Sequence, residues 1–394
     1  MSQRDLCPIC NGLGNVLYRQ NFGAESTSFL SSYDVSVCRD CGCGFAAGIP
    51  PQAEFDAYYR DMSKYEYQHQ GGGATDYETA IFNAPVRHIE QFAPDKDTRI
   101  LDIGCATGRF LWALKGAGYT DLTGSDPSAQ CAATAQRLYG LRVITAPLAG
   151  LTTNEGLYEL VLMTGVLEHL CDLHTALEQV TRLLAPNGRL YIIVPDVAQL
   201  EQFKNAPFQL FSVEHINFFS VQSLDNLMRR HGLRRVFVAA ALSEQSHNTV
   251  EPDIAVAYER DDTMTGAEIV RDTITESALR DYCARSQQAE DAVARDIEAL
   301  VETRQPLLVW GVGTNTLHLL HTTRLGEANI VAFVDSNPKY QDKTLHDRPI
   351  IAPEMVGNYS EDILIGSWMF QSEIETTIRE TLGLANGLIK LYRF

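Results

Sequence analysis

Two closely spaced cysteine pairs near the start of the chain constrain its folding more than any other feature. Cys7 and Cys10 enclose Pro-Ile, and Cys38 and Cys41 enclose Arg-Asp. A Cys-x-x-Cys turn presents two sulfurs from one tight loop, and zinc is held by four thiolates in a tetrahedron. A segment this short cannot build a sufficient core by itself. We therefore expect residues 1–70 to form a zinc knuckle domain with these four cysteines as structural ligands.

Two alternatives stay open at these cysteines. Five of the nine cysteines lie within the first 43 residues, and Cys43 is a spare thiol that could replace Cys41 as a ligand. A redox-active pair is the other interpretation of a Cys-x-x-Cys sequence, although two paired units fit a metal better. Where thiols are kept reduced, the clustered set indicates zinc ligands and not disulfides.

The charge balance argues against a nucleic-acid partner. The chain has 32 Lys and Arg residues against 50 Asp and Glu residues, a formal net charge of −18. Nucleic-acid binding draws most of its affinity from cations that meet phosphates. The sequence also contains neither an apolar run of about 18 residues, as a membrane span needs, nor an apolar signal segment behind Met1. We expect a cytoplasmic protein, a monomer or weak dimer, without a nucleic-acid or membrane partner.

The chain of 394 residues is too long for one ordinary core, and its pattern changes along its length. Residues 71–262 alternate strands with helices, which predicts an α/β fold with a parallel sheet and crossover helices. The expected strands are 99–103, 122–125, 141–145, 160–163 and 189–194, and the expected helices 76–93, 110–116, 129–139 and 173–184. An amphipathic linking helix within residues 263–304 then leads to a second Rossmann-like α/β unit over residues 305–394.

A glycine-containing loop joins the first of these strands to a helix. It reads Asp102-Ile-Gly104-Cys-Ala106-Thr-Gly108. Gly104 would permit a tight turn and the close approach of a ligand, Gly108 would let the helix pack closely, and the helix N-terminus would receive a carboxylate. Asp126 ends the next strand, where an acidic side chain can accept hydrogen bonds from both hydroxyls of a ribose.

This loop is open to two interpretations. A nicotinamide-binding Rossmann domain also has a Gly-rich turn between a strand and a helix. The sequence here is D-x-G-x-x-x-G and not G-x-G-x-x-G, however, and it resembles class I S-adenosylmethionine (SAM) methyltransferases, as does the later stretch from Gly165 to Leu170. The resemblance implies a Rossmann-like domain that binds SAM. The expected cofactor contacts are Asp102, Gly104, Ala106, Gly108, Asp126, Pro127, Leu148 and Thr164.

A histidine beside a glutamate follows the last strand of this unit. Glu214 and His215 precede the aromatic stretch Phe218-Phe219-Ser220. A histidine that titrates near neutrality can remove a proton as general base, an effect of roughly 10²–10⁴-fold. Removing a proton from a carbon next to a ketone also requires a hydrogen-bond donor for the enolate oxygen, which Tyr65 or Tyr67 could supply. From the residues alone, a structural role for this histidine stays open.

The order of these parts along the whole chain resembles the sugar C-methyltransferase family, whose members methylate C3 of nucleotide-linked 4-keto-6-deoxysugars. The family's Glu-His pair matches Glu214-His215, its Tyr-x-Tyr segment matches Tyr65-Glu-Tyr67, and its histidine after the fourth strand matches His169. The resemblance implies that His215 is the base, that Glu214 orients it, and that Tyr65 or Tyr67 supports the enolate. It differs at Phe211–Val213, where members often read Tyr-His before Glu-His.

The same resemblance places the substrate contacts. The C-terminal unit helps to hold the nucleotide diphosphate in the family, and a Gly-rich turn before a helix binds phosphate through free N–H groups. The family's His-Gly-Gly-Ser stretch reads His247-Asn-Thr-Val here. The expected substrate contacts are Asn217, Phe219, His247, Gly311, Gly313 and Asp335. A packing module without a ligand is the alternative for the C-terminal unit.

We predict a SAM-dependent C-methyltransferase that acts on a nucleotide-linked keto-deoxysugar, with three alternatives. An O-methyltransferase of a sugar or natural-product hydroxyl could use the same histidine to deprotonate an alcohol. An RNA-directed methyltransferase would need a basic face, against which the net charge speaks. A scaffold that has lost SAM binding is disfavoured because Asp102, Gly104, Gly108 and Asp126 are all present.

Overall fold

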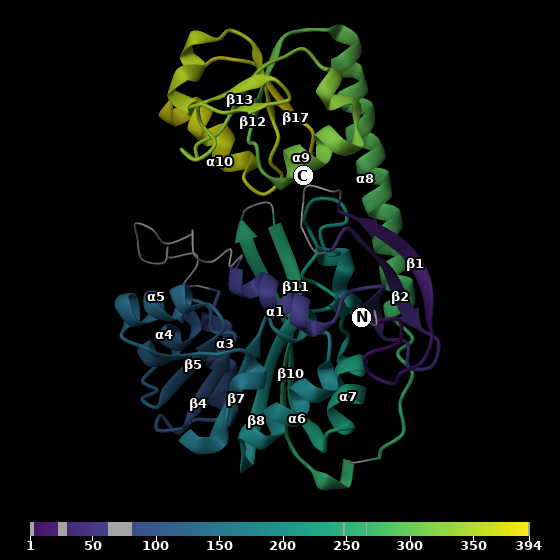
Figure 1. The fold of residues 1–394 in the computed structure, drawn as a ribbon, viewed down its shortest axis with the longest axis vertical. Helices are drawn as coiled ribbons and strands as arrows, with labels where there is room; N and C mark the ends of the chain where they lie inside the picture. The colour runs from purple at the N-terminus through teal and green to yellow at the C-terminus, as the bar shows by residue number, and fades with distance from the viewer. Residues whose placement is uncertain (1–3, 23–29, 62–80, 247–248, 265, 393–394) are drawn as a thin grey trace.

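The described part of the chain has three β-sheets, with helices packed against them and one long helix at the side. The computed structural model describes residues 4–22, 30–61, 81–246, 249–264 and 266–392. Figure 1 shows the N-terminal strands against one flank of the central domain and the C-terminal α/β unit beyond it, with α8 (Thr275–Thr303) running between them along one side. The N-terminal and C-terminal parts are therefore both attached to the central domain.

The N-terminal sheet is completed by a strand from the central domain. Its order is β1-β2-β3-β9, with antiparallel pairing throughout. Its strands are β1 (Gly14–Asn21), β2 (Ser32–Cys38), β3 (Gly44–Ala47) and β9 (Asn217–Phe218), and α1 (Gln52–Asp61) follows β3. The apolar core beside this sheet combines Val35 and Phe55 with Phe211 of the central domain and Tyr282 of α8. The N-terminal segment thus shares its core with the rest of the chain.

The central sheet has seven strands in the order β10-β11-β8-β7-β4-β5-β6. These are β4 (Ile100–Ile103), β5 (Leu122–Asp126), β6 (Arg142–Thr145), β7 (Tyr158–Thr164), β8 (Leu184–Pro195), β10 (Leu233–Ser246) and β11 (Thr249–Arg260). Strands β8, β7, β4, β5 and β6 are parallel, as predicted. Their bounds agree closely with the predicted ones, except that β8 begins at Leu184 instead of residue 189.

The expectation of a wholly parallel sheet is wrong at one edge. Strands β10 and β11 form an antiparallel hairpin, and β11 also pairs antiparallel with β8. Because an antiparallel pair needs only a short connection, no crossover helix marks this hairpin in the sequence. From Arg234 to Glu244 every second residue of β10 is exposed, which is the period expected of a strand at the edge of a sheet.

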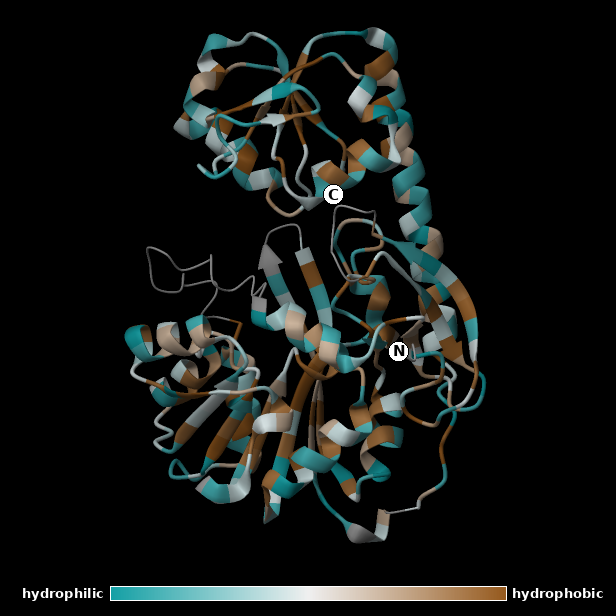
Figure 2. Ribbon diagram, in the orientation of Figure 1, coloured by the Kyte–Doolittle hydropathy of each residue, from teal (hydrophilic) through white to brown (hydrophobic). Residues whose placement is uncertain are grey.

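Helices cover both faces of the central sheet. Apolar residues of α3 (Asn83–Phe92), α4 (Arg109–Gly116) and α5 (Ala129–Tyr139) belong to the core on one face. Those of α6 (Leu173–Leu183) and α7 (Val221–Arg229) belong to the core on the other. The strands between them are apolar over most of their length (Figure 2). The 3₁₀ helices are η2 (Leu148–Gly150), η3 (Thr153–Glu155), η4 (Leu167–His169), η5 (Val197–Gln202), η6 (Asp262–Met264), η7 (Arg324–Glu327) and η8 (Pro353–Asn358).

The linking helix α8 begins at Thr275, directly after a loop that contains Asp272. The Oδ1 atom of Asp272 accepts hydrogen bonds from the backbone N–H groups of Ile274 (2.8 Å) and Thr275 (3.1 Å), so this side chain caps the helix. The backbone N–H of Asp272 in turn donates to the carbonyl of Cys41 at 2.8 Å. The start of α8 is therefore fixed to the cysteine-bearing loop.

The C-terminal unit is a second α/β domain with its own core. Its sheet has the order β14-β15-β13-β12-β16-β17. The elements are β12 (Leu307–Trp310), α9 (Thr314–Thr322), β13 (Ile330–Val334), β14 (Thr344–Leu345), β15 (Arg348–Ile351), β16 (Asp362–Ile365), α10 (Gln371–Thr376), the π-helix η9 (Thr377–Thr381) and β17 (Leu388–Lys390). Strands β12 and β13 coincide with the strands that the sequence pattern predicts at 307–310 and 330–334. Across the described residues, no helix has the length and apolarity needed to cross a membrane.

Candidate active site

A cleft of about 1980 Å³ lies between the central sheet and the C-terminal unit. Its walls include residues at the carboxyl ends of β4, β5, β7 and β8 on one side, and Gly311, Gly313 and Asp335 on the other. Ligands of open α/β sheets bind outside the carboxyl ends of the strands. Pockets for one small ligand have volumes of about 300–1,000 Å³, so this cleft has room for two ligands at once.

The loop after β4 is fixed by backbone constraints. Gly104 has a φ of +71°, and a Cβ there would lie 2.6 Å from Cγ2 of Val166. Gly108, directly before α4, has a φ of +79°, and a Cβ would lie 2.9 Å from Cδ1 of Leu141. Ala106 has a φ of +46°, a conformation that is strained for any residue but glycine. Its N–H donates to Oδ2 of Asp126 at 2.9 Å, which holds the strained turn.

Two carboxylates flank this loop. Asp102 is buried in β4, and Asp126 at the end of β5 also accepts a hydrogen bond from the N–H of Ser128 at 2.9 Å. Burial and the nearby charge of Asp126 raise the pKa of Asp102 to about 8. Burial also raises the pKa of Asp126, against the two backbone hydrogen bonds that lower it. Because a buried charge without a partner is costly, a cationic ligand would stabilise the ionised form of Asp102.

The polar groups of this wall fit a SAM molecule. Within the part of the chain that the structure describes, the buried hydroxyls of Ser125 and Thr164 have no hydrogen-bond partner, and both residues line the cleft. Buried polar atoms are almost always hydrogen-bonded, so these atoms point to an absent ligand. Asp102 could hold the ammonium group of SAM, Asp126 its ribose, and the N-terminus of α4 its carboxylate. Ala106, Pro127 and Leu148 line the same wall, whereas Gly108 lies behind it.

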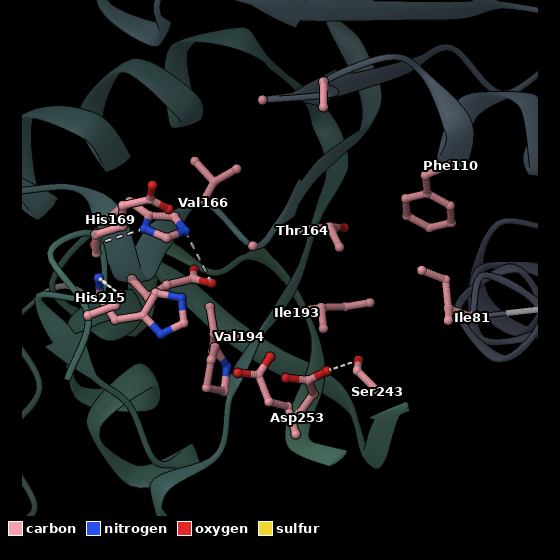
Figure 3. A pocket seen from close by; sticks show the side chains of 18 of the residues that line it. Ile81, Phe110, Thr164, Val166, His169, Ile193, Val194, His215, Ser243 and Asp253 are labelled. Carbon is pink, nitrogen blue, oxygen red and sulfur yellow. Dashed lines mark hydrogen bonds and ion pairs between the residues drawn. The ribbon is translucent and has the colours of Figure 1, made fainter. Parts of the chain in front are cut away.

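Two histidines from separate segments meet in the cleft. His169 ends η4 and His215 precedes β9, and their ring centroids are 5.0 Å apart (Figure 3). Nδ1 of His169 lies 2.8 Å from the carbonyl oxygen of Glu214, which leaves Nε2 on the side of Glu168, 3.8 Å from its Oε1. The backbone N–H of His215 donates to Oγ of Ser212 at 3.1 Å. The structure therefore holds an imidazole pair beside a buried carboxylate.

Glu214 contacts this pair through its backbone. Its carboxylate oxygen Oε1 accepts a hydrogen bond from the hydroxyl of Tyr58 on α1 at 3.1 Å. Its carbonyl accepts a hydrogen bond from Nδ1 of His169 when that nitrogen carries the proton. Glu214 thus connects α1 to the histidine pair, and its carbonyl orients His169.

Asn217 and Phe219 are not among the residues that line the cleft. The amide Nδ2 of Asn217 donates to the carbonyls of Leu167 (3.1 Å), Glu168 (3.3 Å) and Leu170 (2.8 Å), and its Oδ1 accepts from Arg4 at 2.8 Å. Phe219 is buried in the core below the sheet. In this position Asn217 holds the η4 turn that carries Glu168 and His169.

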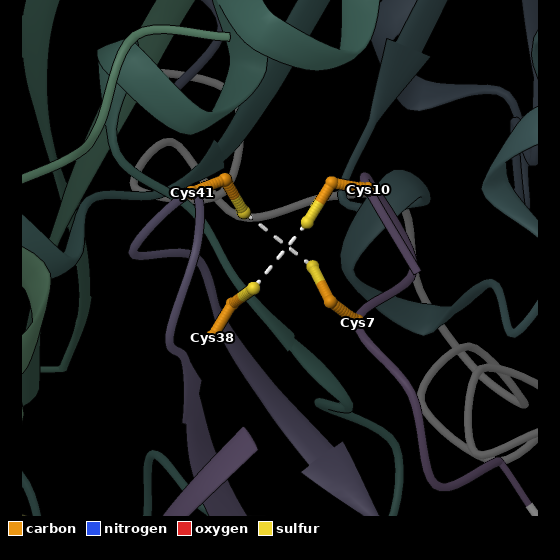
Figure 4. Close-up of side chains that lie close together, drawn as sticks. All are labelled: Cys7, Cys10, Cys38 and Cys41. Atoms are coloured by element: carbon orange, nitrogen blue, oxygen red, sulfur yellow. Dashed lines mark hydrogen bonds between the residues drawn. The ribbon is translucent and has the colours of Figure 1, made fainter. Parts of the chain in front are cut away.

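The four cysteines predicted as zinc ligands converge on one point (Figure 4). Sγ of Cys7 lies 3.5 Å from Sγ of Cys41, and Sγ of Cys10 lies 3.3 Å from Sγ of Cys38. The backbone N–H groups of Ile9 and Asp40 donate to Cys7 and Cys38, both at 3.4 Å, which favours thiolates. Zinc bonds of about 2.3 Å to sulfur in a tetrahedron fit such a cluster. Cys43 is outside it and donates to the carbonyl of Gly44 at 3.4 Å.

The C-terminal unit repeats the hydrogen bonds of the loop after β4. Asp335 follows β13, and its Oδ2 accepts from the N–H of Val312 at 2.9 Å, while its Oδ1 accepts from the N–H of Asn337 at 2.8 Å. Asp126 accepts from the N–H groups of Ala106 and Ser128 in the same way. The Gly311–Gly313 turn therefore shares these two hydrogen bonds with the loop after β4, and both glycines line the cleft.

Some predicted site residues cannot be placed, and some residues of the site were not predicted. Tyr65, Tyr67 and His247 lie outside the described residues. Glu168, Tyr58 and Asp253 line or border the site without having been predicted. Glu168 stands next to His169 in the sequence, which is a signal that could have identified it. Tyr58 and Asp253 are brought in by α1 and by the β10–β11 hairpin, so no local pattern indicated them.

Comparison with known proteins gives matches for two parts of the chain. Residues 77–236 match the family model described as a methyltransferase domain, and residues 303–389 match one described as C2185-like, N-terminal. The C-methyltransferase NovU of Streptomyces niveus is 25% identical over 388 residues, 94% of this chain and 87% of NovU. This match confirms the expected resemblance to C-methyltransferases over the whole length.

Two further matches each cover about half of the chain. The O-methyltransferase cnsE of Penicillium expansum is 25% identical over 190 residues, 46% of this chain and 65% of cnsE. Among solved structures, the magnesium protoporphyrin IX methyltransferase of Synechocystis PCC 6803 with bound SAM is 16% identical, with a TM-score of 0.38 over 54% of this chain and 98% of that one.

Proposed function

We propose that this SAM-dependent methyltransferase methylates the carbon next to the ketone of a nucleotide-linked 4-keto-6-deoxysugar, with His215 as the general base. The observation that carries the proposal is the cleft itself. One wall holds the loop after β4 and the His169–His215 pair, and the opposite wall presents the Gly311–Gly313 turn. A substrate with a reactive sugar at one end and a nucleotide at the other would span these two walls.

The chemistry requires a base at the sugar end. His215 would take the proton from C3, and the electron pair of the broken C–H bond would move towards C4 and place negative charge on the ketone oxygen. When bound, SAM would supply the methyl group for the new bond at C3, and S-adenosylhomocysteine would leave with the electron pair of the broken sulfur–carbon bond. His169, oriented by the Glu214 carbonyl, would face the buried carboxylate of Glu168, which favours a positive charge on the pair as the proton arrives. Tyr65 or Tyr67 would support the enolate.

The nucleotide end is assigned to the C-terminal unit. The free N–H groups at the N-terminus of α9 would receive the diphosphate, and Asp335 would accept from ribose hydroxyls as Asp126 does in the SAM site. In this proposal Asn217 and Phe219 act by holding the catalytic loops. The four-cysteine cluster would bind structural zinc and keep the N-terminal sheet and α8 in place.

The test is product analysis with a panel of thymidine, cytidine, guanosine and uridine diphospho-4-keto-6-deoxysugars. The wild-type chain with SAM is expected to yield a C-methylated sugar from one of them, and His215→Ala to lower kcat by roughly 10²–10⁴-fold. SAM-induced thermal stabilisation should persist in this variant, because His215 is not among the residues assigned above to SAM. Unchanged methyl transfer by His215→Ala would exclude it as the base.

An O-methyltransferase is the second candidate. The 25% identity to an O-methyltransferase over 190 residues favours it, and the same imidazole could deprotonate an alcohol. NMR of the product distinguishes the two functions, since a methyl group on carbon and one on oxygen resonate far apart.

A further inference from the structure

Asp253 is a buried carboxyl in the active-site cleft to which the reaction described above gives no task. It lies opposite Pro195 where β11 pairs with β8, so it stands at the same edge of the sheet as Thr164. The residue is only 7% exposed, yet it lines the cleft. Figure 3 shows Asp253 and Ser243 in the pocket that also contains His169 and His215. Its position is that of a group that meets the sugar end of a substrate.

The hydrogen bonding of Asp253 involves one of its two oxygens. The hydroxyl of Ser243 on β10 donates to Oδ2. In the described part of the chain, no other group is hydrogen-bonded to this carboxyl. A neutral carboxylic acid carries one O–H donor in addition to its acceptor sites. Because Ser243 donates to Oδ2, a proton held by Asp253 belongs on Oδ1.

The surroundings of Asp253 favour this neutral form. Burial raises its pKa to about 7, against the hydrogen bond from Ser243 that lowers it, and the negative charges of Glu251 and Asp196 raise it further. These are the charged groups that act on it from β11 and from the end of β8. A substantial fraction of the enzyme therefore carries a protonated Asp253 near neutral pH.

We propose that Asp253, positioned by Ser243, donates a hydrogen bond from Oδ1–H to the ketone oxygen of the substrate and stabilises the enolate. This inference rests on the proposed function. As His215 removes the C3 proton, negative charge develops on that oxygen, and the hydrogen bond becomes stronger than it was to the neutral ketone. Asp253 keeps its proton, and the charge leaves the oxygen when C3 bonds to the methyl group. A protonated buried aspartic acid serves as an oxyanion donor in other ketone enolisation.

The test compares Asp253→Ala and Asp253→Asn with the matched control Asp196→Asn. Asp196 is a buried carboxyl of raised pKa near the same sheet edge, but it does not line the cleft and bonds the N–H of Ala198. Asp253→Ala is expected to lower kcat on the order of 10²-fold, as loss of an oxyanion donor does, with a much smaller change in KM. Asp253→Asn retains an N–H donor, so its kcat should fall less than that of Asp253→Ala. Where Asp253 is protonated, Asp196→Asn should keep a kcat close to that of the wild type, and its alkaline decline should begin at slightly lower pH because one charge that raises the pKa of Asp253 is gone.

The pH profile separates this role from a structural one. Wild-type kcat should fall as Asp253 loses its proton at alkaline pH, and Asp253→Asn should lack that decline. Both Asp253 variants should melt no lower than the wild type at pH 8, because the substitution removes a buried charge. Asp253→Ala with wild-type turnover, or Asp253→Asn with an unchanged alkaline decline, would overturn the donor role and leave the proposed function standing. A wild-type enzyme that methylates no keto sugar at carbon would overturn both.

Discussion

The loops after β4 and β12 have the same backbone hydrogen bonds and different surroundings. In each unit an aspartate follows the second strand: Asp126 in the central unit and Asp335 in the C-terminal unit. Its carboxylate accepts one hydrogen bond from a backbone N–H of the glycine-containing loop and another from the N–H of the residue two positions after it. The two units differ, however, two positions before the first glycine of the loop. The buried residue there is Asp102 in the central unit, before Gly104, and Val309 in the C-terminal unit, before Gly311. The two units share the hydrogen-bonded aspartate, but only the central unit has a second, buried carboxylate, Asp102, that could pair with a cation.

The two loops also differ in how tightly they are packed. A Cβ on Gly104 would lie 2.6 Å from Val166, whereas a Cβ on Gly311 would have its nearest neighbour, Oγ1 of Thr316, at 4.0 Å. The first loop is enclosed and preorganised, and the second is open towards the cleft. This difference fits a cationic cofactor that stays close to the sheet and an anionic substrate that enters and leaves.

The glycine pair gives the largest expected contrast. Gly104→Ala should abolish the thermal stabilisation by S-adenosylhomocysteine, because the new methyl group collides with Val166 and displaces the loop. Gly311→Ala should keep that stabilisation and lose only about 1–2 kcal/mol of folding free energy to the left-handed conformation, since its φ is +100°. An equal response to S-adenosylhomocysteine in both variants, measured by thermal shift, would remove the contrast.

The aspartate pair should separate the two ligands. Asp126→Ala is expected to weaken S-adenosylhomocysteine binding at least tenfold, since a hydrogen bond to a charged group contributes about 1.5–3 kcal/mol. Asp335→Ala should leave that affinity unchanged and raise KM for the nucleotide sugar by about the same factor. Calorimetry and steady-state kinetics on the two variants measure these effects. Weaker S-adenosylhomocysteine binding in Asp335→Ala would contradict the assignment.

Loss of a cysteine from the four-cysteine cluster should impair nucleotide-sugar binding at the C-terminal unit more than SAM binding. Cys38→Ser is expected to lose bound zinc and, because Asp272 is hydrogen-bonded to Cys41, to loosen the start of α8. KM for the nucleotide sugar should then rise a few-fold while S-adenosylhomocysteine still binds. Cys283→Ser on α8 is the control, with zinc content and kinetics as in the wild type. Metal analysis that finds no zinc in the wild-type chain would contradict this role.

The last contrast concerns Asp102, whose effect should be visible only as a pH dependence of stability without SAM. Its folded pKa of about 8 lies above the ordinary value of 3.8, so the folded state binds the proton more tightly than the unfolded state. The stabilisation is complete below the unfolded pKa and is lost as pH rises through the folded pKa. The melting temperature of the wild type should therefore fall more steeply between pH 6 and 8 than that of Asp102→Asn. Parallel curves would show that Asp102 is not protonated in the free enzyme.

The parts predicted from the sequence are the local ones. The β4–α4–β5 segment and the start of the C-terminal unit follow from strand and helix periods and from glycines that sit directly between the elements they join. Cys7, Cys10, Cys38 and Cys41 converge as expected because each pair comes from one short turn.

The parts that escaped prediction depend on contacts between distant segments. Asn217 holds the turn of His169 through the carbonyls of Leu167, Glu168 and Leu170. Nothing near Asn217 in the sequence distinguishes that role from a substrate contact. Asp253 reaches the cleft only because the β10–β11 hairpin reverses the chain at the edge of the sheet. Neither the contact of Asn217 with the turn of His169 nor the pairing of β10 with β11 can be recognised from a short stretch of sequence.

The most direct test of the account is the NMR spectrum of the sugar formed with ¹³C-methyl-labelled SAM. A labelled methyl group bonded to the carbon next to the ketone is expected, with loss of the proton from that carbon, and His215→Ala should form this product at least about 10²-fold more slowly. A labelled methyl group on oxygen, or a carbon-methylated product of normal yield from His215→Ala, would contradict the account.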